Sequence, residues 1–216
     1  MPHHLFRAAH AWVFDLDNTL YPSSARLFDQ IERKMTDYVA ELLGVEAAEA
    51  DRLRALWWRA HGTTLAGLMQ EHRADPEPYL HAVHDIDLSG LTLDAALRAA
   101  IEALPGRKIV YTNGSRGHAD RVLAARGLND LFDARYGIED SLYLPKPARA
   151  AFERVFAADG LEARGAAMVE DDHRNLAAPR EMGMRTLWVT ERDEGGEHHD
   201  AATDDLAGFL AIVGER

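Results

Sequence analysis

Two aspartates that follow a short apolar run constrain this chain more than any other feature. Residues 11–14 (Ala-Trp-Val-Phe) are all apolar, and Asp15 and Asp17 come directly after them. An apolar run of this length is typical of a strand that is buried on both faces of a sheet. Open α/β sheets bind ligands outside the carboxyl ends of such strands. The two carboxylates are therefore expected at a ligand site, although Asp17-Asn18-Thr19 is also ordinary turn chemistry.

Strand and helix signals alternate through the second half of the chain. Expected strands cover residues 108–112, 166–169 and 185–189, and expected helices cover residues 92–104 (capped by Thr92), 117–126, 148–158, 176–182 and 206–213. Residues 191–205 are acidic and contain glycine, so we expect a loop there. Strands that alternate with helices in short units predict an α/β fold with a doubly wound parallel sheet, a Rossmann-like core.

A helical block interrupts this alternation. Apolar residues recur at helical spacing from Leu27 to Leu42, after Ser23 or Ser24 as the N-cap and before Gly44. Further helices are expected at 46–61, 65–72 and 78–84. The predicted domains are therefore an α/β catalytic core of residues 1–21 and 92–216 and an all-helical cap of residues 22–91.

Composition limits the partners. The 216 residues are 47% hydrophobic, enough for a proper core, and the net charge of -12 disfavours a nucleic-acid polymer or an anionic membrane. A small phosphate ester needs only local cations and is not excluded. There is no cysteine, hence no disulfide or thiolate site, and no apolar stretch resembles a signal peptide or a membrane span. We expect a cytoplasmic protein; its oligomeric state stays open.

The first aspartate pair suits phosphoryl transfer. Asp15 can attack phosphorus as a nucleophile and form an aspartyl-phosphate. Asp17 can protonate the leaving oxygen and later deprotonate the attacking water. Carboxylates at this place also suit Mg²⁺, a hard cation that takes oxygen ligands.

Three later clusters follow predicted strands or lie in loops between the predicted elements. Thr112, Asn113 and Gly114 end one strand and open a helix, which makes an anion cradle for a substrate phosphate. Lys146 would bring a fixed positive charge to the phosphoryl group. Glu170 and Asp171 can complete a Mg²⁺ site with Asp15 and the backbone carbonyl of Asp17, and Asn175 can support that loop.

Each of these clusters alone has a plainer interpretation. Residues 112–115 could be only a turn with a helix N-cap. Lys146 lies between two prolines and could be a solvated lysine in a stiff loop. Residues 170–172 could be only the acidic first turn of a helix. Their order and their placement along one alternating sheet favour convergence on a single site.

In their order along the chain, the aspartate pair and the three later clusters resemble the four motifs of the haloacid dehalogenase superfamily, and the resemblance covers most of the chain. It implies that the helical insert is a mobile cap that closes over the substrate and excludes water. Asp17 resembles the acid of the phosphatase members, which the dehalogenase members lack.

A closer similarity is to the pyrimidine 5'-nucleotidase branch. It rests on residues 15–22, 27–31, 84–88, 112–115 and 143–147. The branch implies a Mg²⁺-dependent 5'-nucleotidase that removes phosphate from UMP or CMP, so the expected partner is a small phosphate ester, a nucleotide. Asp172 departs from the serine found in many relatives.

Other functions stay open. They are a phosphatase for phosphoglycolate or a sugar phosphate, a 2-haloacid dehalogenase, and a non-catalytic binding protein on the same fold. We expect His81, His84, His198 and His199 to be surface or cap residues and not metal ligands, because no carboxylate-supported spacing accompanies them. Trp57 and Trp58 are expected to pack within the cap, with base stacking as the alternative.

Overall fold

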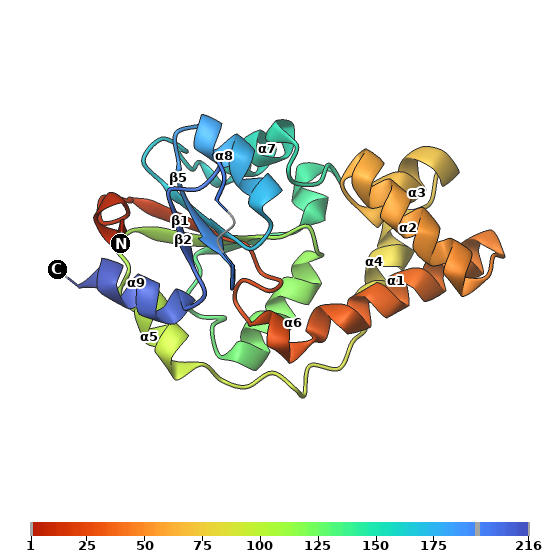
Figure 1. The fold of residues 1–216 in the computed structure, drawn as a ribbon, viewed down its shortest axis with the longest axis horizontal. Coiled ribbons are helices and arrows are strands. Elements are labelled where there is room, and N and C mark those ends of the chain that lie inside the picture. Colours follow the sequence, from red (N-terminus) through yellow and green to blue (C-terminus); the bar gives the residue numbers. More distant parts are fainter. Residues whose placement is uncertain (1, 193–194, 216) are drawn as a thin grey trace.

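A six-stranded parallel sheet forms the core of the computed structural model, which describes residues 2–192 and 195–215 (Figure 1). The strand order is β3-β2-β1-β4-β5-β6, and every pair is parallel. The strands are β1 (Ala11–Phe14), β2 (Arg107–Tyr111), β3 (Ala134–Tyr136), β4 (Ala167–Glu170), β5 (Arg185–Val189) and β6 (Ala201–Thr203). The predicted α/β fold class is confirmed.

The strand order places β1 at the centre of the sheet. It pairs with β2 on one side and with β4 on the other. The strand order reverses at this point, and such a switch opens a crevice outside the carboxyl ends of the strands. The polar residues that follow β1, β2 and β4 therefore meet at one edge.

Helices cover both faces of the sheet, as the alternating side chains of β1 require. Trp12 and Phe14 point into a cluster shared with α5 (Ala95–Ala103), α6 (Arg116–Arg126) and α9 (Leu206–Gly214). Ala11 and Val13 point to the other face and pack against α7 (Arg149–Asp159) and α8 (Ala177–Glu181). All four side chains are at least 96% buried, which explains the uninterrupted apolar run.

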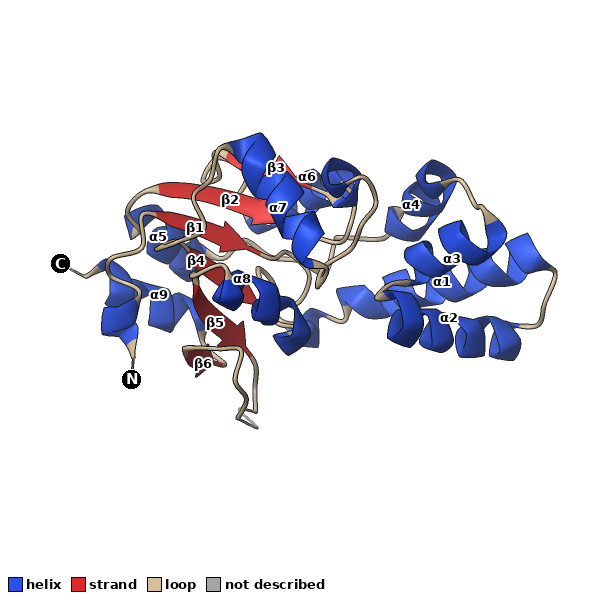
Figure 2. Cartoon of the chain, turned by 90° about the horizontal axis from the view of Figure 1, so that it is seen from above, coloured by secondary structure: helices blue, strands red, loops and turns tan. Residues whose placement is uncertain are grey.

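The helical block lies beyond the carboxyl ends of the central strands, and the arrows of β1 and β2 point toward it (Figure 2). It consists of α1 (Leu27–Leu43), α2 (Ala47–His61), α3 (Thr64–His72) and α4 (Pro76–His84). Short 3-10 turns are η1 (His3–Leu5), η2 (Ser23–Ala25), η3 (Ile138–Ser141) and η4 (His173–Leu176). We call α1–α4 the cap helices.

Two helix starts differ from the sequence-based prediction. Ser23 and Ser24 do not cap α1, because they form η2, and Arg26 adopts a left-handed conformation with φ of 52° before α1 begins. Thr92 does not cap α5, because the side chain of Asp94 accepts the hydrogen bond from Leu97 N.

Two short strands were not predicted. The edge strands β3 and β6 have three residues each, and none of the residues of β3 is fully buried, so no apolar run marks it. β6 lies within residues 191–205, which we expected to be a loop; of these, 193 and 194 are outside the described part of the chain. In the described residues no helix combines the length and apolarity that crossing a bilayer demands.

Candidate active site

The carboxyl ends of β1, β2 and β4 bring three of the sequence-predicted clusters together. Asp15 continues the ladder beyond β1, since its N–H donates to Val169 O at 2.9 Å. Thr112 does the same beyond β2, and Glu170 is the last residue of β4. Asp15, Thr112 and Glu170 are all buried. Their positions follow from strands whose register is fixed by pairing on both sides.

Lys146 joins the clusters through its ammonium group. Its Nζ donates to Asp15 Oδ1 at 2.6 Å, to Glu170 Oε2 at 2.7 Å and to Tyr111 O at 3.1 Å, and the side chain is only 1% exposed. Burial lowers the pKa of Lys146, but the two carboxylates outweigh that effect and leave the pKa above its ordinary value. The lysine is therefore a fixed buried cation and not the solvated loop residue of the plainer interpretation.

Three carboxylates gather beside this lysine. Ligand oxygens of Asp15, Glu170 and Asp171 lie within 4.8 Å of one another, and among the described residues no other group of three potential metal ligands does so. Burial and then repulsion by Glu170 raise the pKa of Asp15 to about 7, against the attraction of Lys146. Burial and the neighbouring carboxylates raise the pKa of Asp171 to about 9. An all-oxygen set with this much uncompensated repulsion fits a divalent cation.

The loop after β4 is held by side chains around the acids. Asn175 Nδ2 donates to Glu170 Oε1 at 2.9 Å, as expected for a supporting residue. Trp188 Nε1 donates to Asp171 O at 2.8 Å. Since both oxygens of Glu170 are engaged, by Lys146 and Asn175, Asp171 has the freer carboxylate for a metal.

The side chain of Asp17 lies apart from that cluster. Its Oδ1 accepts hydrogen bonds from Tyr21 Oη and His118 Nε2, both at 2.8 Å. Burial raises the pKa of Asp17, but His118 and Tyr21 outweigh it, so the pKa lies below its ordinary value. Any contribution of Asp17 to the metal would come from its backbone carbonyl, as the sequence analysis expects.

The loop after β2 has two separate structural roles. Gly114 N donates to Thr112 Oγ1 at 2.8 Å, so the hydroxyl hydrogen of Thr112 is available for a phosphate oxygen. The Asn113 side chain pairs with the backbone of Lys146, so a contribution of Asn113 to anion binding would come from its backbone N–H. Ser115 caps α6 by accepting from His118 N. The helix thus begins at the site, as the predicted anion cradle requires.

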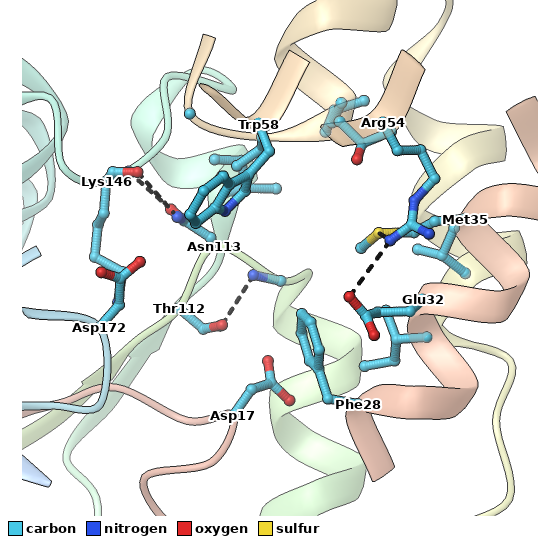
Figure 3. Close-up of a pocket in the computed structure, with 18 of the residues that line it drawn as sticks. Asp17, Phe28, Glu32, Met35, Arg54, Trp58, Thr112, Asn113, Lys146 and Asp172 are labelled. Atoms are coloured by element: carbon cyan, nitrogen blue, oxygen red, sulfur yellow. Dashed lines mark hydrogen bonds and ion pairs between the residues drawn. The ribbon is translucent and has the colours of Figure 1, made fainter. Parts of the chain in front are cut away.

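A cavity of about 550 Å³ lies between this edge of the sheet and the cap helices. Figure 3 shows Trp58 and Arg54 on the cap side of the cavity, with Arg54 reaching toward Glu32. The apolar side chains of Phe28 and Met35 also line the cavity. The cavity therefore has a polar, carboxylate-rich end in the core and a mixed aromatic and polar end in the cap.

The paired tryptophans differ in their surroundings. Trp57 is fully buried among the cap helices, as expected, whereas Trp58 is 48% exposed and lines the cavity. The guanidinium of Arg174 lies 3.8 Å from the centre of the Trp58 ring. Arg174 is also paired with Asp172 at 2.6 Å, so the charge that Asp172 adds is compensated locally.

Sequence reasoning missed several site residues. Arg54, His118 and Arg174 belong to none of the motifs. Tyr21 lies within residues 15–22 but was given no role, and its spacing of four residues from Asp17 could have suggested the contact. His84 was expected to be a surface or cap residue; it ends a cap helix but is buried against His118. His81 is exposed as expected, and His199 lies by His173 and is not a member of the carboxylate group.

The chain is similar to a known hydrolase family and to known proteins. Residues 10–183 match a family described as "Hydrolase: haloacid dehalogenase-like hydrolase". Phosphate metabolism protein 8 of Saccharomyces cerevisiae is 27% identical over 215 residues, covering 92% of this chain and 67% of that protein. Enolase-phosphatase E1 of Pseudomonas aeruginosa is 28% identical over 218 residues, covering 96% of this chain and 94% of that protein.

Solved structures resemble the whole chain in fold. A HAD phosphatase from Thermococcus onnurineus aligns with a TM-score of 0.66 at 20% identity, covering 94% of this chain and 97% of that one. A 2-haloacid dehalogenase from Pseudomonas syringae pv. Tomato aligns with a TM-score of 0.60 at 22% identity, covering 95% and 97%. At these identities the similarity concerns the fold and does not decide between the two reactions.

Proposed function

Because the chain belongs to the haloacid dehalogenase-like hydrolase family, we propose that it is a Mg²⁺-dependent phosphatase acting on pyrimidine nucleoside 5'-monophosphates. The observation that carries the choice of reaction is Asp17, a second, mostly buried carboxylate two residues after the nucleophile at the same cavity. Phosphate esters of ordinary alcohols, nucleosides included, have a leaving oxygen that needs a proton, whereas C–halogen hydrolysis releases a halide that does not.

In the first half of the proposed reaction, Asp15 attacks phosphorus and forms an aspartyl-phosphate. The bond from phosphorus to the ester oxygen breaks, and Asp17 gives its proton to that oxygen. The two hydrogen bonds to Asp17 favour its ionised form in the resting site. The negative charge of a bound phosphate acts in the opposite direction and favours the proton.

In the second half, Asp17 takes a proton from a water molecule, which attacks the aspartyl-phosphate and frees Asp15. Lys146 keeps its positive charge beside Asp15 throughout and stabilises the developing charge. The Thr112 hydroxyl and the backbone N–H groups of Asn113 and Gly114 would hold the phosphate oxygens.

Asp15, Asp171, the carbonyl of Asp17 and, in support, Glu170 would hold the Mg²⁺. When bound, the cation supplies charge neutralisation for the phosphoryl oxygens. The core and cap boundaries of the sequence analysis, a cytoplasmic location, and the absence of nucleic-acid and membrane partners belong to the same proposal.

The cap end of the cavity supports a nucleotide substrate. A volume of about 550 Å³ exceeds what phosphoglycolate needs. Trp58 and Phe28 offer flat apolar surface to a base. Arg54 also lines the cavity, with its guanidinium held by Thr36 and Glu32, and a guanidinium can donate to a pyrimidine carbonyl oxygen. The name of the Pseudomonas aeruginosa relative, enolase-phosphatase E1, supports the reaction class.

The test is turnover of the purified protein with Mg²⁺ against UMP, CMP, AMP, GMP, phosphoglycolate, glucose 6-phosphate and 2-chloropropionate. We expect UMP or CMP to have the highest kcat/KM. The matched variants are Asp15→Asn, which should be inactive, and Asp37→Asn, an exposed carboxylate on α1 whose loss should have no effect.

The outcomes separate the parts of the proposal. A preference of about tenfold or more for phosphoglycolate or glucose 6-phosphate would contradict the nucleotide assignment and leave the phosphatase in place. Chloride release with no phosphate release from any ester would support the dehalogenase alternative. No turnover of any compound would support a non-catalytic binding protein.

A further inference from the structure

Two hydrogen-bond donors converge on one oxygen of Asp17. Tyr21 Oη and His118 Nε2 each lie 2.8 Å from Oδ1. Tyr21 belongs to the loop after β1, and His118 lies in the first turn of α6, so the donors come from separate parts of the core. Two hydrogens on Oδ1 leave Oδ2 as the oxygen that can carry a transferable proton.

The contacts of His118 identify its tautomer. Nε2 faces the carboxylate oxygen, and within the described residues Nδ1 is buried without a hydrogen-bond partner. A protonated Nδ1 would bury an unpaired N–H, which costs about 1–3 kcal/mol. The arrangement therefore fits a neutral ring that donates from Nε2 and has a bare Nδ1.

A second histidine fixes the ring of His118 from the cap. His84, the last residue of α4, stacks on His118 with ring centroids 4.4 Å apart and planes 13° apart. Nδ1 of His84 lies 3.0 Å from Ser115 Oγ, and Ser115 caps the helix that carries His118. The guanidinium of Arg121 on the same helix donates to His84 O. The stack is thus tied to α6 at both rings.

The stack also lies against Gly114 of the loop after β2. A Cβ placed on Gly114 would lie 3.3 Å from His118 Cδ2 and 3.3 Å from His84 Nε2. A side chain at position 114 would therefore press on both rings. The stacking on His84 and the hydrogen bond to Asp17 hold the His118 ring, as is needed if His118 is to keep a carboxylate in one orientation.

We propose that His118 and Tyr21 are positioning residues that hold Asp17 by Oδ1 and turn Oδ2 toward the leaving group, with His84 bracing His118 from the cap. The inference rests on the proposed phosphatase function. In the first half-reaction the hydrogen on Oδ2 passes to the ester oxygen as its bond to phosphorus breaks. In the second half-reaction Oδ2 takes a hydrogen from the attacking water. His118 and Tyr21 keep their own hydrogens in both.

If His118 positions Asp17, the loss of activity on replacing His118 should depend on the leaving group of the substrate. Release of a nucleoside from UMP or CMP needs a proton in the transition state, whereas release of p-nitrophenolate does not. His118→Phe retains an aromatic ring for the stack and removes the donor. We expect kcat for the nucleotide to fall by about 10- to 100-fold, kcat for p-nitrophenyl phosphate to fall much less, and KM to change by less than about threefold.

Conservative and control variants separate positioning from folding. His118→Gln can place an N–H near Asp17 and should recover at least about tenfold of the lost nucleotide turnover. Tyr21→Phe should show the same leaving-group pattern with a smaller loss. His81→Phe, an exposed histidine on α4, and Tyr136→Phe, whose hydroxyl donates to Asp159, should match the wild type for both substrates.

A double variant tests whether His118 acts through Asp17. In the Asp17→Asn background, His118→Phe should add less than about a twofold loss, since residues that act as a unit are not additive. A full additional loss, or equal losses for the two leaving groups at an unchanged melting temperature, would overturn the inference. If His118→Phe does not fold, the His118→Gln and Tyr21→Phe variants test the inference by the same comparison of the two leaving groups.

The same data distinguish the inference from the proposed function. If Asp17→Asn itself loses both substrates equally, the acid role fails and the positioning role fails with it. If Asp17→Asn shows the leaving-group pattern and the His118 and Tyr21 variants do not, the phosphatase mechanism stands and only the positioning role is wrong.

Discussion

The side-chain amide of Asn113 is bonded to both backbone polar groups of Lys146. Lys146 N donates to Asn113 Oδ1 at 2.8 Å, and Asn113 Nδ2 donates to Lys146 O at 3.1 Å. The pair joins the loop after β2 to the Pro-Lys-Pro segment, 33 residues further along the chain. The residue that brings the buried cation to Asp15 is therefore held at its backbone by the loop after β2.

Replacing Asn113 should misplace that cation. We expect Asn113→Ala to lower kcat by about 10- to 100-fold with a smaller change in KM, because small displacements of a catalytic group cost this much. Steady-state kinetics with UMP or CMP measure it. The control is Asn129→Ala at an exposed asparagine. A kcat within about twofold of wild type in a folded Asn113→Ala protein would show that the pair is dispensable.

Much of the site was predictable because its residues are local to strand ends. Asp15, Thr112 and Glu170 each follow or end an apolar strand, and parallel strands bring their carboxyl ends together whatever the loops do. The contact between His118 and Asp17 joins residues 101 positions apart, and nothing in the pattern of α6 distinguishes His118 from a surface histidine. Contacts of this kind depend on how distant segments pack in the folded protein, and they leave no periodic pattern in the sequence.

The fold shows the same division. The central strand β1 was predictable because burial on both faces leaves an uninterrupted apolar run, and the body of α1 because burial on one face leaves apolar residues at helical spacing. The edge strand β3 was not, since its three residues are only partly buried and carry no such pattern. The helix starts at Leu27 and Ala95 depend on Arg26 and Asp94, where backbone conformation and a local hydrogen bond decide between neighbouring polar residues.

Asp15→Asn should abolish turnover without unfolding the protein. The amide has nearly the shape of the carboxylate but cannot attack phosphorus, so we expect a loss of at least about a thousandfold. Mass spectrometry after acid quenching should find a phosphoryl adduct on the wild type and none on the variant. The measurement is repeated on Asp37→Asn, which should behave as wild type. Residual turnover of several per cent in Asp15→Asn would rule out the covalent mechanism.

The metal-free protein should lose stability as the pH rises. Asp15 and Asp171 have folded-state pKa values raised to about 7 and about 9, above their ordinary value near 3.8. Between these limits the folded state binds more protons than the unfolded state, so the free energy of unfolding falls with rising pH. A bound divalent cation favours the ionised carboxylates. We therefore expect Mg²⁺ to raise the melting temperature, and to raise it more at pH 8.5 than at pH 6.

Asp171→Asn tests the source of this effect. Without the Asp171 carboxylate, less charge is buried in the metal-free site, so the variant should melt higher than wild type in chelator at pH 8.5. Added Mg²⁺ should shift its melting temperature little. Asp37→Asn should retain the full Mg²⁺ response of the wild type. A Mg²⁺ response of wild-type size in Asp171→Asn would remove that residue from the metal site.

Gly67→Ala should destabilise the cap. A Cβ at this position of α3 would lie 2.1 Å from Trp57 Cγ and 2.4 Å from Trp57 Cβ, and Trp57 on α2 is fully buried. The two helices can approach this closely only because Gly67 has no side chain, and forcing atoms into such a contact costs about 1–3 kcal/mol or more. In a protein of this size each kcal/mol lowers the melting temperature by about 2–4 °C. Calorimetry should therefore find a melting temperature several degrees below that of the wild type.

Gly117→Ala on α6 is the matched control, because nothing lies within 4 Å of its Cβ position and alanine is the better helix former. This variant should melt at or slightly above the wild-type temperature. Equal melting temperatures for the two variants would mean that α2 and α3 adjust freely around Trp57, and the close approach would then not be a determinant of cap packing.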